Sequence, residues 1–335
     1  MIGRPVRTLA PGVIGLLALV GVLGAPDAPA ASEKVMVGVS AVGSGDAGFL
    51  MAYEGGFFER EGLDVELVFL GNGTEATQAL VSGRLAACLV AGPAPVFASL
   101  AGGELVWIAG LVNSLPYVLV VSPDVTAPAD LKGKRLAVNR LGSTAELAAR
   151  LALARLGLDP RTDVTLLPMG EQVTRLAALQ AGSVQATLLE PPATVIARRL
   201  GFRELVSLAK LSLRFPHEAL TTSRRFLRER PDTARRLVTG LVVGTHAFKT
   251  QREEGMRVLR KYLRMDDPQG LVEAYASAAS LMEAKPYMPV EAVQTVLDML
   301  AQSDARARAA QAADFIDMRF VRELDTSGFI DRLYR

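Results

Sequence analysis

The chain has 335 residues, of which 50% are hydrophobic and 21% are charged, so it is long and apolar enough to bury a core in each of two domains. Its 37 Lys and Arg residues against 35 Asp and Glu residues leave a net charge of +2. Since no long basic run is interleaved with aromatics, nucleic acid is excluded as an expected partner. The single cysteine, Cys88, excludes a disulfide and falls in a predicted buried strand, where it provides no lipidation site.

The N-terminus has the pattern of an export signal. Arg4 and Arg7 precede an apolar run over residues 13–23, and Ala28-Pro29-Ala30 offers small residues for cleavage. We therefore expect residues 1–30 to be a cleavable signal peptide and the mature protein to be periplasmic. An uncleaved anchor is the less favoured alternative, because a run of about eleven residues is shorter than the roughly 20 that span a bilayer.

The chain contains an internal repeat, displaced by a constant 99 residues. Residues 39–102 and 138–201 align without a gap, and 17 of the 64 positions are identical. The identities fall where turns and helix ends demand particular residues, as in Gly43-Ser44 with Gly142-Ser143 and Pro93-Ala94 with Pro192-Ala193. A repeat of this length is too long for a solenoid unit, and it predicts two similar lobes with a cleft between them.

Each copy predicts strands that alternate with helices. For the first copy the expected elements are a strand over 35–40, a helix over 49–60, a strand over 63–70, a helix over 75–82 and a strand over 86–91. For the second they are a strand over 135–139, a helix over 144–156, a strand over 164–168, a helix over 174–181 and a strand over 185–189. This alternation predicts an α/β fold with mostly parallel sheets flanked by helices.

Beyond Arg224 the pattern changes to helices alone. Apolar residues recur at helical spacing over 231–249, 253–264, 268–282 and 289–302. We expect this helical C-terminal segment to pack on the first lobe. Lobe I would then comprise residues 33–120 and 220–335, lobe II would comprise 121–219, and the chain would cross between them near 118–122 and 215–222.

Ligands of parallel sheets bind outside the carboxyl ends of the strands. The loops at those ends are 40–48, 71–74, 92–93 and 113–117 in one lobe, and 140–144, 169–171 and 190–192 in the other. The ligand-binding residues that we predict from these loops are Gly43, Ser44, Asp46, Asn72, Gly92, Pro93, Ser114, Tyr117, Gly142, Ser143, Thr144, Glu190 and Pro191.

Several short motifs resemble those of a known family. They read YEGGFF at 53–58, EGLDV at 61–65, DLKGKR at 130–135 and LGLD at 156–159. They resemble the periplasmic solute-binding proteins of ABC importers, of the subgroup for nitrate, sulfonates, taurine and thiamine-pyrimidine precursors, over roughly residues 33–250. The resemblance implies a two-lobed, type II-like receptor that closes on a small solute and presents it to an inner-membrane permease with a cytoplasmic ATPase. It also implies a monomer without a cofactor.

The sharpest site candidate is Gly142-Ser143-Thr144. A hydroxyl residue after a glycine turn at a helix start offers free backbone N–H groups and a positive dipole end, which suit a sulfonate, carboxylate or phosphate. Because Gly43-Ser44 occupies the equivalent place in the first copy, two such helix ends would form an anion clamp. Simple capping of the helix is the alternative role for these serines.

Asp46 and Glu190 complicate an anion site, because two carboxylates near the cleft repel an anion. If both line the pocket, we expect a solute that carries a cationic or donor group, such as an amino-sulfonate or a pyrimidine, rather than bare nitrate. The alternative for Asp46 is a solvated loop acid.

The remaining candidates divide between ligand contact and structure. Tyr117 and Phe49 could stack on a planar ligand or belong to the core or hinge, and Asn113 and Ser114 leave the same choice open. Trp107 is expected in the core and His246 in a structural helix position. His217, together with Arg214, lies near the second predicted crossing, where it could reach a ligand.

Two other function classes remain in view. A ligand-sensing module for a membrane kinase would use the same cleft with a different partner. A pyrimidine-metabolism enzyme on the resembling fold would carry a cysteine cluster, and the chain has one cysteine. With two histidines and no supporting motif, we nominate no catalytic residue and no metal ligand.

Overall fold

The computed structural model describes residues 32–335 apart from 41, 212 and 303. The expected signal peptide of residues 1–30 lies outside these described residues. Among the helices that are described, none combines the length and the apolar character needed to cross a bilayer.

The first of two five-stranded sheets has the strand order β2-β1-β3-β10-β4. Its strands are β1 (Glu33–Val39), β2 (Leu63–Phe69), β3 (Ala87–Leu89), β4 (Leu105–Ser114) and β10 (Arg214–Ser223). β1 pairs in parallel with β2 and β3, whereas β10 runs antiparallel to β3 and β4. We call the part of the chain built on this sheet lobe I.

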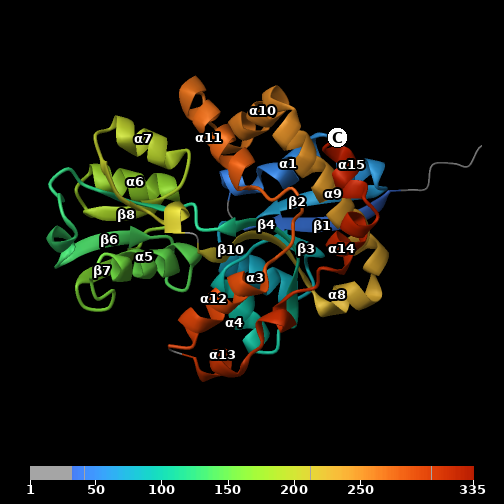
Figure 1. The fold of residues 1–335 in the computed structure, drawn as a ribbon, viewed down its shortest axis with the longest axis horizontal. Helices are drawn as coiled ribbons and strands as arrows, with labels where there is room; N and C mark the ends of the chain where they lie inside the picture. The colour runs from blue at the N-terminus through green and yellow to red at the C-terminus, as the bar shows by residue number, and fades with distance from the viewer. Residues whose placement is uncertain (1–31, 41, 212, 303) are drawn as a thin grey trace, which may run out of the picture. The chain divides into compact units, whose positions relative to one another are not determined.

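The second sheet has the order β7-β6-β8-β5-β9 and repeats the pairing of the first. Its strands are β5 (Val118–Val121), β6 (Lys134–Val138), β7 (Val164–Pro168), β8 (Ala186–Leu189) and β9 (Arg203–Ser207). β6 is parallel to β7 and β8, and β5 is antiparallel to β8 and β9. We call the part built on it lobe II. Figure 1 shows the strands of the two sheets in separate groups.

The two-lobed α/β class is confirmed, with two differences in the strands. Half of the strand pairings are antiparallel, whereas mostly parallel sheets were expected. The antiparallel pairings involve β5, β9 and β10, which lie in segments where no strand was expected. The chain also changes sheets earlier than the crossings expected near 118–122 and 215–222. Val118–Val121 already belongs to the second sheet, and Arg214–Ser223 to the first.

The helices of the repeat follow the expected pattern. They are α1 (Ala47–Glu54), α2 (Phe57–Arg60), α3 (Gly73–Val81), α4 (Pro93–Leu100), α5 (Thr144–Arg155), α6 (Gln172–Gln180) and α7 (Ala193–Arg199), with the short 3-10 turns η1 (Ser44–Asp46), η2 (Pro128–Leu131) and η3 (Leu208–Leu211). The single helix expected over 49–60 is wrong, because the chain breaks between α1 and α2. Gly56 has a φ of +66°, in the left-handed region, so the right-handed helix α1 cannot continue through it.

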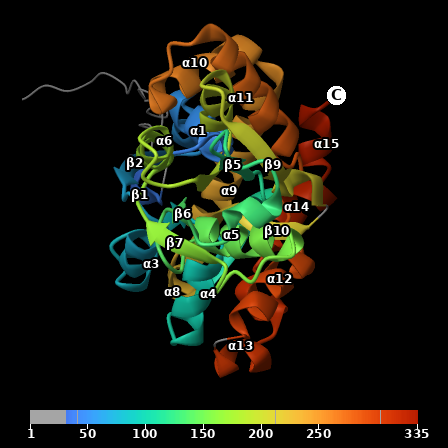
Figure 2. The same ribbon diagram turned by 90° about the vertical axis from the view of Figure 1, so that its left-hand side faces the viewer.

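The C-terminal segment is helical, as predicted. It comprises α8 (Arg224–Glu229), α9 (Pro231–Thr250), α10 (Arg252–Leu263), α11 (Pro268–Leu281), α12 (Val290–Leu300), α13 (Ala305–Ala309), η4 (Ala312–Phe315), α14 (Arg319–Thr326) and α15 (Phe329–Leu333). α9 packs on α1 and α2, and α12 packs on β10. Figures 1 and 2 both show these orange and red helices around the first sheet.

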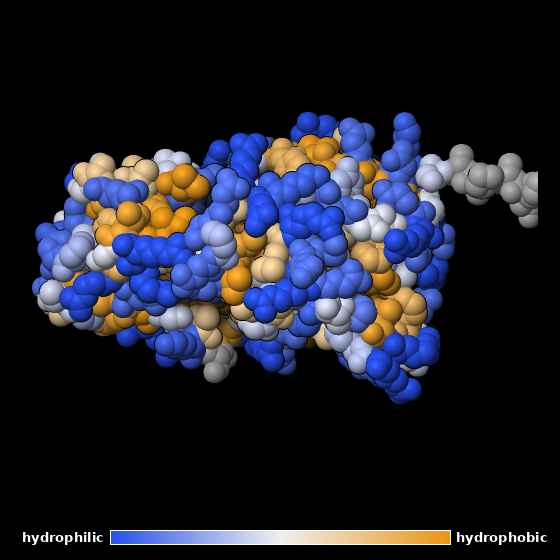
Figure 3. Space-filling model, turned by 90° about the horizontal axis from the view of Figure 1, so that it is seen from above, coloured by the Kyte–Doolittle hydropathy of each residue, from blue (hydrophilic) through white to orange (hydrophobic). Residues whose placement is uncertain are grey.

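The cores contain the residues that the apolar runs predicted. Trp107 in β4 is 1% exposed and its indole Nε1 donates to the Val90 carbonyl at 3.3 Å. Phe49 is fully buried, with its ring centroid 4.9 Å from that of Phe58, so it belongs to the core. Cys88 is buried in β3. On the face drawn in Figure 3, apolar surface is interspersed with polar residues.

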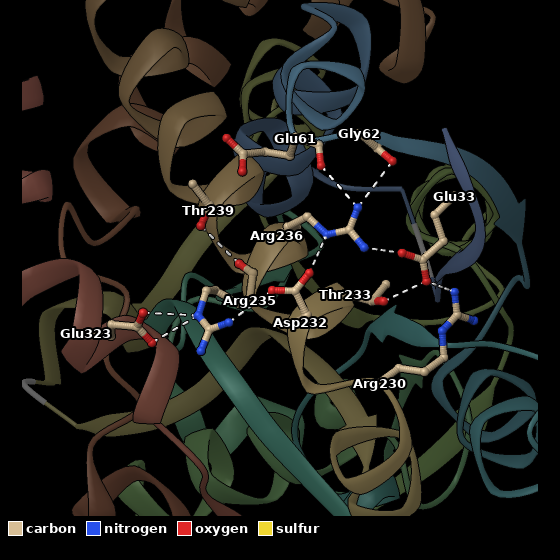
Figure 4. Close-up of polar contacts among 10 residues, drawn as sticks. All are labelled: Glu33, Glu61, Gly62, Arg230, Asp232, Thr233, Arg235, Arg236, Thr239 and Glu323. Carbon is tan, nitrogen blue, oxygen red and sulfur yellow. Dashed lines mark hydrogen bonds and ion pairs between the residues drawn. The ribbon is translucent and has the colours of Figure 1, made fainter. Parts of the chain in front are cut away.

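A polar cluster joins the start of β1 to α9 (Figure 4). The Glu33 carboxylate accepts hydrogen bonds from Arg230, Arg236 and Thr233, the last at 2.7 Å. Partial burial opposes ionisation of Glu33, but these three donors outweigh it and lower its pKa to about 2. The cluster therefore fixes the start of β1 to the helix that packs on α1.

Candidate functional site

A pocket opens between the loops of the two lobes, where the carboxyl ends of the parallel strands meet. Lobe I lines it with Ser40, Val42, Gly43, Gly45, Asp46, Asn72, Gly73, Thr74, Val90, Ala91, Pro93, Ala94, His217 and Glu218. Tyr117, between β4 and β5, lines it as well. Lobe II contributes Asn139, Arg140, Gly142, Ser143, Thr144, Ala145, Glu171, Gln172, Arg175 and Glu190.

Most of the predicted ligand-binding residues line this pocket. They are Gly43, Asp46, Asn72, Pro93, Tyr117, Gly142, Ser143, Thr144 and Glu190. The other predicted residues, Ser44, Gly92, Ser114 and Pro191, are not among the lining residues. Ser44 Oγ donates to the Pro191 carbonyl at 3.2 Å, so these two residues contact each other across the lobes. Contact of any of them with a solute stays a prediction.

Gly92 has a role that the sequence did not indicate. Its φ is +71°, and a Cβ built at this position would lie 2.2 Å from Oγ1 of Thr144 in lobe II. Only glycine has both the left-handed conformation and the space for this approach. Gly92 therefore lets the two lobes meet at the edge of the pocket.

The two Gly-Ser loops differ in structure although their sequences match. Ser143 caps α5, because its Oγ accepts from Glu146 N at 3.2 Å, and it also donates to the Arg140 carbonyl at 2.6 Å. Gly43, with an extended backbone, precedes the short turn η1 instead. Neither serine hydroxyl is free for an anion.

One backbone donor in each of these loops is also bound to a carboxyl of the chain itself. Gly43 N donates to Asp46 Oδ2 at 2.8 Å, and Gly142 N donates to Glu146 Oε2 at 2.6 Å. Asn72 similarly caps α3, with its Oδ1 accepting from Thr74 N and Glu75 N. Because Gly43 N and Gly142 N already have these partners, the structure weakens the expectation of an anion clamp.

Two carboxyls meet on the lobe I wall. Asp46 is 2% exposed and Glu218, in β10, is 8% exposed. They lie close enough for each to affect the pKa of the other. Burial, reinforced by the neighbouring negative charges, raises the pKa of both carboxyls above the ordinary value.

The lobe II wall contributes Glu190, held by Gln172. The Gln172 Nε2 donates to Glu190 Oε1 at 3.0 Å, and the Gln172 Oε1 accepts from Glu190 N at 2.8 Å. The other carboxylate oxygen lies 3.0 Å from Nε2 of His217 in lobe I. The His217 ring in turn packs edge-on against Tyr117, with centroids 5.4 Å apart.

Arg175 is a buried cation in the pocket lining. It lies on α6, is 2% exposed, and lines the pocket from lobe II. Its Nε and Nη1 are buried and hydrogen-bond to no described group. Burial lowers its pKa, and the nearby Tyr117, Glu190 and Glu171 oppose that shift. An arginine remains charged even so, which leaves a positive group that nothing in the described structure pairs directly.

Other candidates turn out to be structural. Asn113 Nδ2 donates to the Tyr287 carbonyl at 2.7 Å, and Arg214 pairs with Glu283 on the surface. His246 packs against the Tyr334 ring, 4.8 Å away. Cys88 is not among the lining residues. Among the described His, Cys, Asp and Glu residues, no group of three or more is arranged to hold a metal ion.

Sequence reasoning missed Arg175 and Glu218. Arg175 lies in a helix and Glu218 in a strand, whereas the predicted ligand-binding residues came from the loops at the strand ends. The repeat itself held a signal for Arg175, since the equivalent residue of the first copy is Ala76, which is fully buried. A charged residue at a core position of a repeated helix needs an oppositely charged or hydrogen-bonding partner, which the corresponding apolar position of the other copy does not need. For Glu218, an acid within the run RFPHEALTTS was the comparable signal.

Comparison with known proteins places this architecture in a family. A family model described as NMT1/THI5 like matches residues 45–254, which is more than half of the chain. The chain belongs to the NMT1/THI5-like family. This confirms the resemblance stated from the sequence motifs. No match is found among curated protein sequences.

Solved structures resemble the NMT1/THI5-like chain along most of its length. A protein from Bordetella bronchiseptica RB50 is 22% identical, with a TM-score of 0.77 over 88% of this chain and 97% of that one. The alkanesulfonate-binding protein SsuA from Xanthomonas axonopodis pv. citri, bound to MOPS, is 19% identical, with a TM-score of 0.70 over 85% of this chain and 98% of that one. The periplasmic nitrate-binding protein NrtA from Synechocystis PCC 6803 is 14% identical, with a TM-score of 0.68 over 88% of each chain. At these identities the likeness shows the fold, which is that of periplasmic solute-binding proteins.

Proposed function

We propose that this protein is an extracytoplasmic solute-binding receptor of an ABC importer. The observation that carries the proposal is the pocket between the lobes, because its lining comes from strand-end loops of both sheets and includes buried polar side chains without partners. If the pocket were only a contact surface between the two lobes, its buried polar side chains would be expected to have hydrogen-bond partners within the protein. A small polar solute would supply the missing partners.

Hinge closure is the mechanism that this arrangement supports. The lobes contact each other around the pocket through Ser44 with Pro191, through His217 with Glu190, and at the rim through an ion pair of Arg140 with Glu75 at 3.5 Å. A solute that contacts both walls binds the closed arrangement better than an open one. It therefore shifts the population toward closure.

Export and delivery complete the proposal. The N-terminal pattern of residues 1–30 favours export to the periplasm, where the receptor would present its solute to an inner-membrane permease driven by a cytoplasmic ATPase. The alkanesulfonate- and nitrate-binding proteins of the same fold support this role by analogy. We propose that lobe I, with the C-terminal helices, and lobe II are the two parts that move.

A thermal-shift screen of the purified protein tests the proposed function. The panel would contain sulfonates, nitrate, amino acids, amino-sulfonates, pyrimidines and aromatic carboxylates. A solute at 100 times its dissociation constant adds about 2.7 kcal/mol to the free energy of unfolding, which raises the melting temperature visibly. At least one class is expected to do so. Absence of a shift with every class would contradict the proposal.

A further inference from the structure

Buried polar atoms without partners are concentrated in the pocket. Among the described residues, side-chain atoms of this kind include Asp46 Oδ1, Arg175 Nε and Nη1, and His217 Nδ1, all from residues of the pocket lining. A polar atom that is buried and unpartnered costs free energy, and native proteins contain few of them. Several within one pocket therefore indicate the chemistry of the group that pairs with them.

The lobe II wall requires an acceptor. A guanidinium donates N–H groups in fixed directions and binds the oxygens of a carboxylate or sulfonate well. In Arg175, Nε and Nη1 are buried and hydrogen-bond to no described residue. Glu190 and Glu171 act on Arg175 only through their charge, without a hydrogen bond to it. Arg175 is thus available for an anionic group.

The lobe I wall requires a donor. Asp46 Oδ2 accepts from Gly43 N, but Oδ1 accepts from no described group. Glu218 lies beside it, and neither carboxyl forms an ion pair with a described Lys, Arg or His residue. A protonated amine would satisfy Oδ1 and also relieve the repulsion among Asp46, Glu218 and Glu190.

We infer that the solute is bipolar, with an anionic group held by Arg175 of lobe II and a protonated amine held by Asp46 and Glu218 of lobe I. The inference rests on the proposed function and narrows its solute class. Because each lobe holds one charge, only a solute with both charges gains the full set of contacts when the lobes close. A solute with an anionic group alone would face three carboxyls.

Matched compounds test this inference by titration calorimetry on the purified protein. The series runs from glycine through the ω-amino carboxylates to 6-aminohexanoate, with taurine, and each compound is paired with the alkanoate, ethanesulfonate or alkylamine that lacks one charge. Chain length varies so that the series covers a range of distances between the two charges. At least one bipolar compound should bind at least about tenfold more tightly than both of its single-charge analogues.

Variants assign the two charges to the two walls. Arg175→Met and Asp46→Asn should each weaken binding of that compound by at least about tenfold. The control Arg155→Met, at an exposed position near the end of α5, should leave affinity unchanged. Without solute, Arg175→Met should also raise the melting temperature, because it removes a buried charge that has no partner.

Two results would overturn the inference, and they differ. If ethanesulfonate or an alkanoate binds as tightly as its bipolar counterpart, and Asp46→Asn strengthens that binding, the solute is a simple anion and the receptor remains. If no compound of either kind binds and Arg175→Met lowers the melting temperature, Arg175 is a structural residue. The inference then fails, and the thermal-shift screen with the other solute classes decides the proposed function separately.

Discussion

His217 Nε2 and Glu190 Oε2 lie 3.0 Å apart and join β10 of lobe I to the loop after β8 of lobe II inside the pocket. Both side chains are largely buried, with 10% and 12% of their surface exposed. Gln172 holds Glu190 through two hydrogen bonds, so this carboxylate is fixed to lobe II. A solute that competes for Glu190 would therefore act on the contact between the lobes.

Glu190→Gln tests this contact. The variant keeps the shape of the side chain but removes its charge, and we expect it to weaken binding of solutes with a cationic or donor group by about 1 kcal/mol or more. Solutes without such a group should be little affected. Titration calorimetry with one solute of each kind measures the difference, and an equal loss for both would assign Glu190 a purely structural role.

The acid pair predicts how stability depends on pH. Burial, and then the neighbouring charges, raise the pKa of Asp46 and Glu218 in the folded state. Such groups bind more protons when folded, so the stability they contribute is fully present below the unfolded pKa of about 4 and is lost as pH rises through the folded pKa. We expect the free energy of unfolding to fall over this window, by at most about 1.4 kcal/mol per pH unit for each group.

Asp46→Asn should remove part of that dependence. The free energy of unfolding of the variant minus that of the unmutated protein should be larger at pH 7.5 than at pH 4. Urea unfolding of both proteins at both pH values measures this difference. His217 and Glu190 face the same space and are unchanged in the variant, so the comparison isolates the Asp46 carboxyl. The same difference in stability at both pH values would mean that Asp46 ionises normally.

The cluster at Glu33 predicts the opposite dependence. Its pKa is lowered to about 2, so its stabilising contribution is present above the unfolded pKa of about 4.3 and is lost as pH falls toward 2. Glu33→Gln should therefore destabilise the protein at pH 7 and converge with the unmutated protein near pH 2. Urea unfolding across this range measures it, and a constant difference would contradict the ion-pair account.

Close packing of α1 on α9 predicts a strong effect at Gly244. A Cβ at this position would lie 2.4 Å from the Ala52 Cβ and 2.5 Å from its Cα, and backbone atoms cannot move aside cheaply. Gly244→Ala should lower the free energy of unfolding by about 1–3 kcal/mol. Thermal or urea unfolding would show this, and an unchanged midpoint would mean that the two helices are not in such close contact.

Much of the fold could be predicted from the repeat. Because β1, β2 and β3 pair in the same way as β6, β7 and β8, one copy predicts the other. The antiparallel strands β9 and β10 could not be predicted this way, since they have no equivalent in the aligned copies. The loops of the site followed from the rule that ligands bind at strand ends.

The chemistry of the site was less predictable. Gly43-Ser44 and Gly142-Ser143 are identical in sequence, yet Asp46 occupies the first loop where Ala145 stands in the second copy, and only Ser143 became a helix cap. Arg175 and Glu218 lie in elements where periodicity indicates only burial. The groups that surround a buried charge depend on how the two lobes approach each other. A local sequence pattern does not encode that approach.

The central claim is that a small solute binds between the two lobes, and titration calorimetry on a blocked pocket tests it most directly. Ala94→Trp would fill the pocket from α4, and Ala154→Trp, at an exposed position of α5, is the control. With the solute that most raises the melting temperature, we predict one-to-one binding to the unmutated protein and the control, and none to Ala94→Trp. Unchanged binding to Ala94→Trp would contradict the claim.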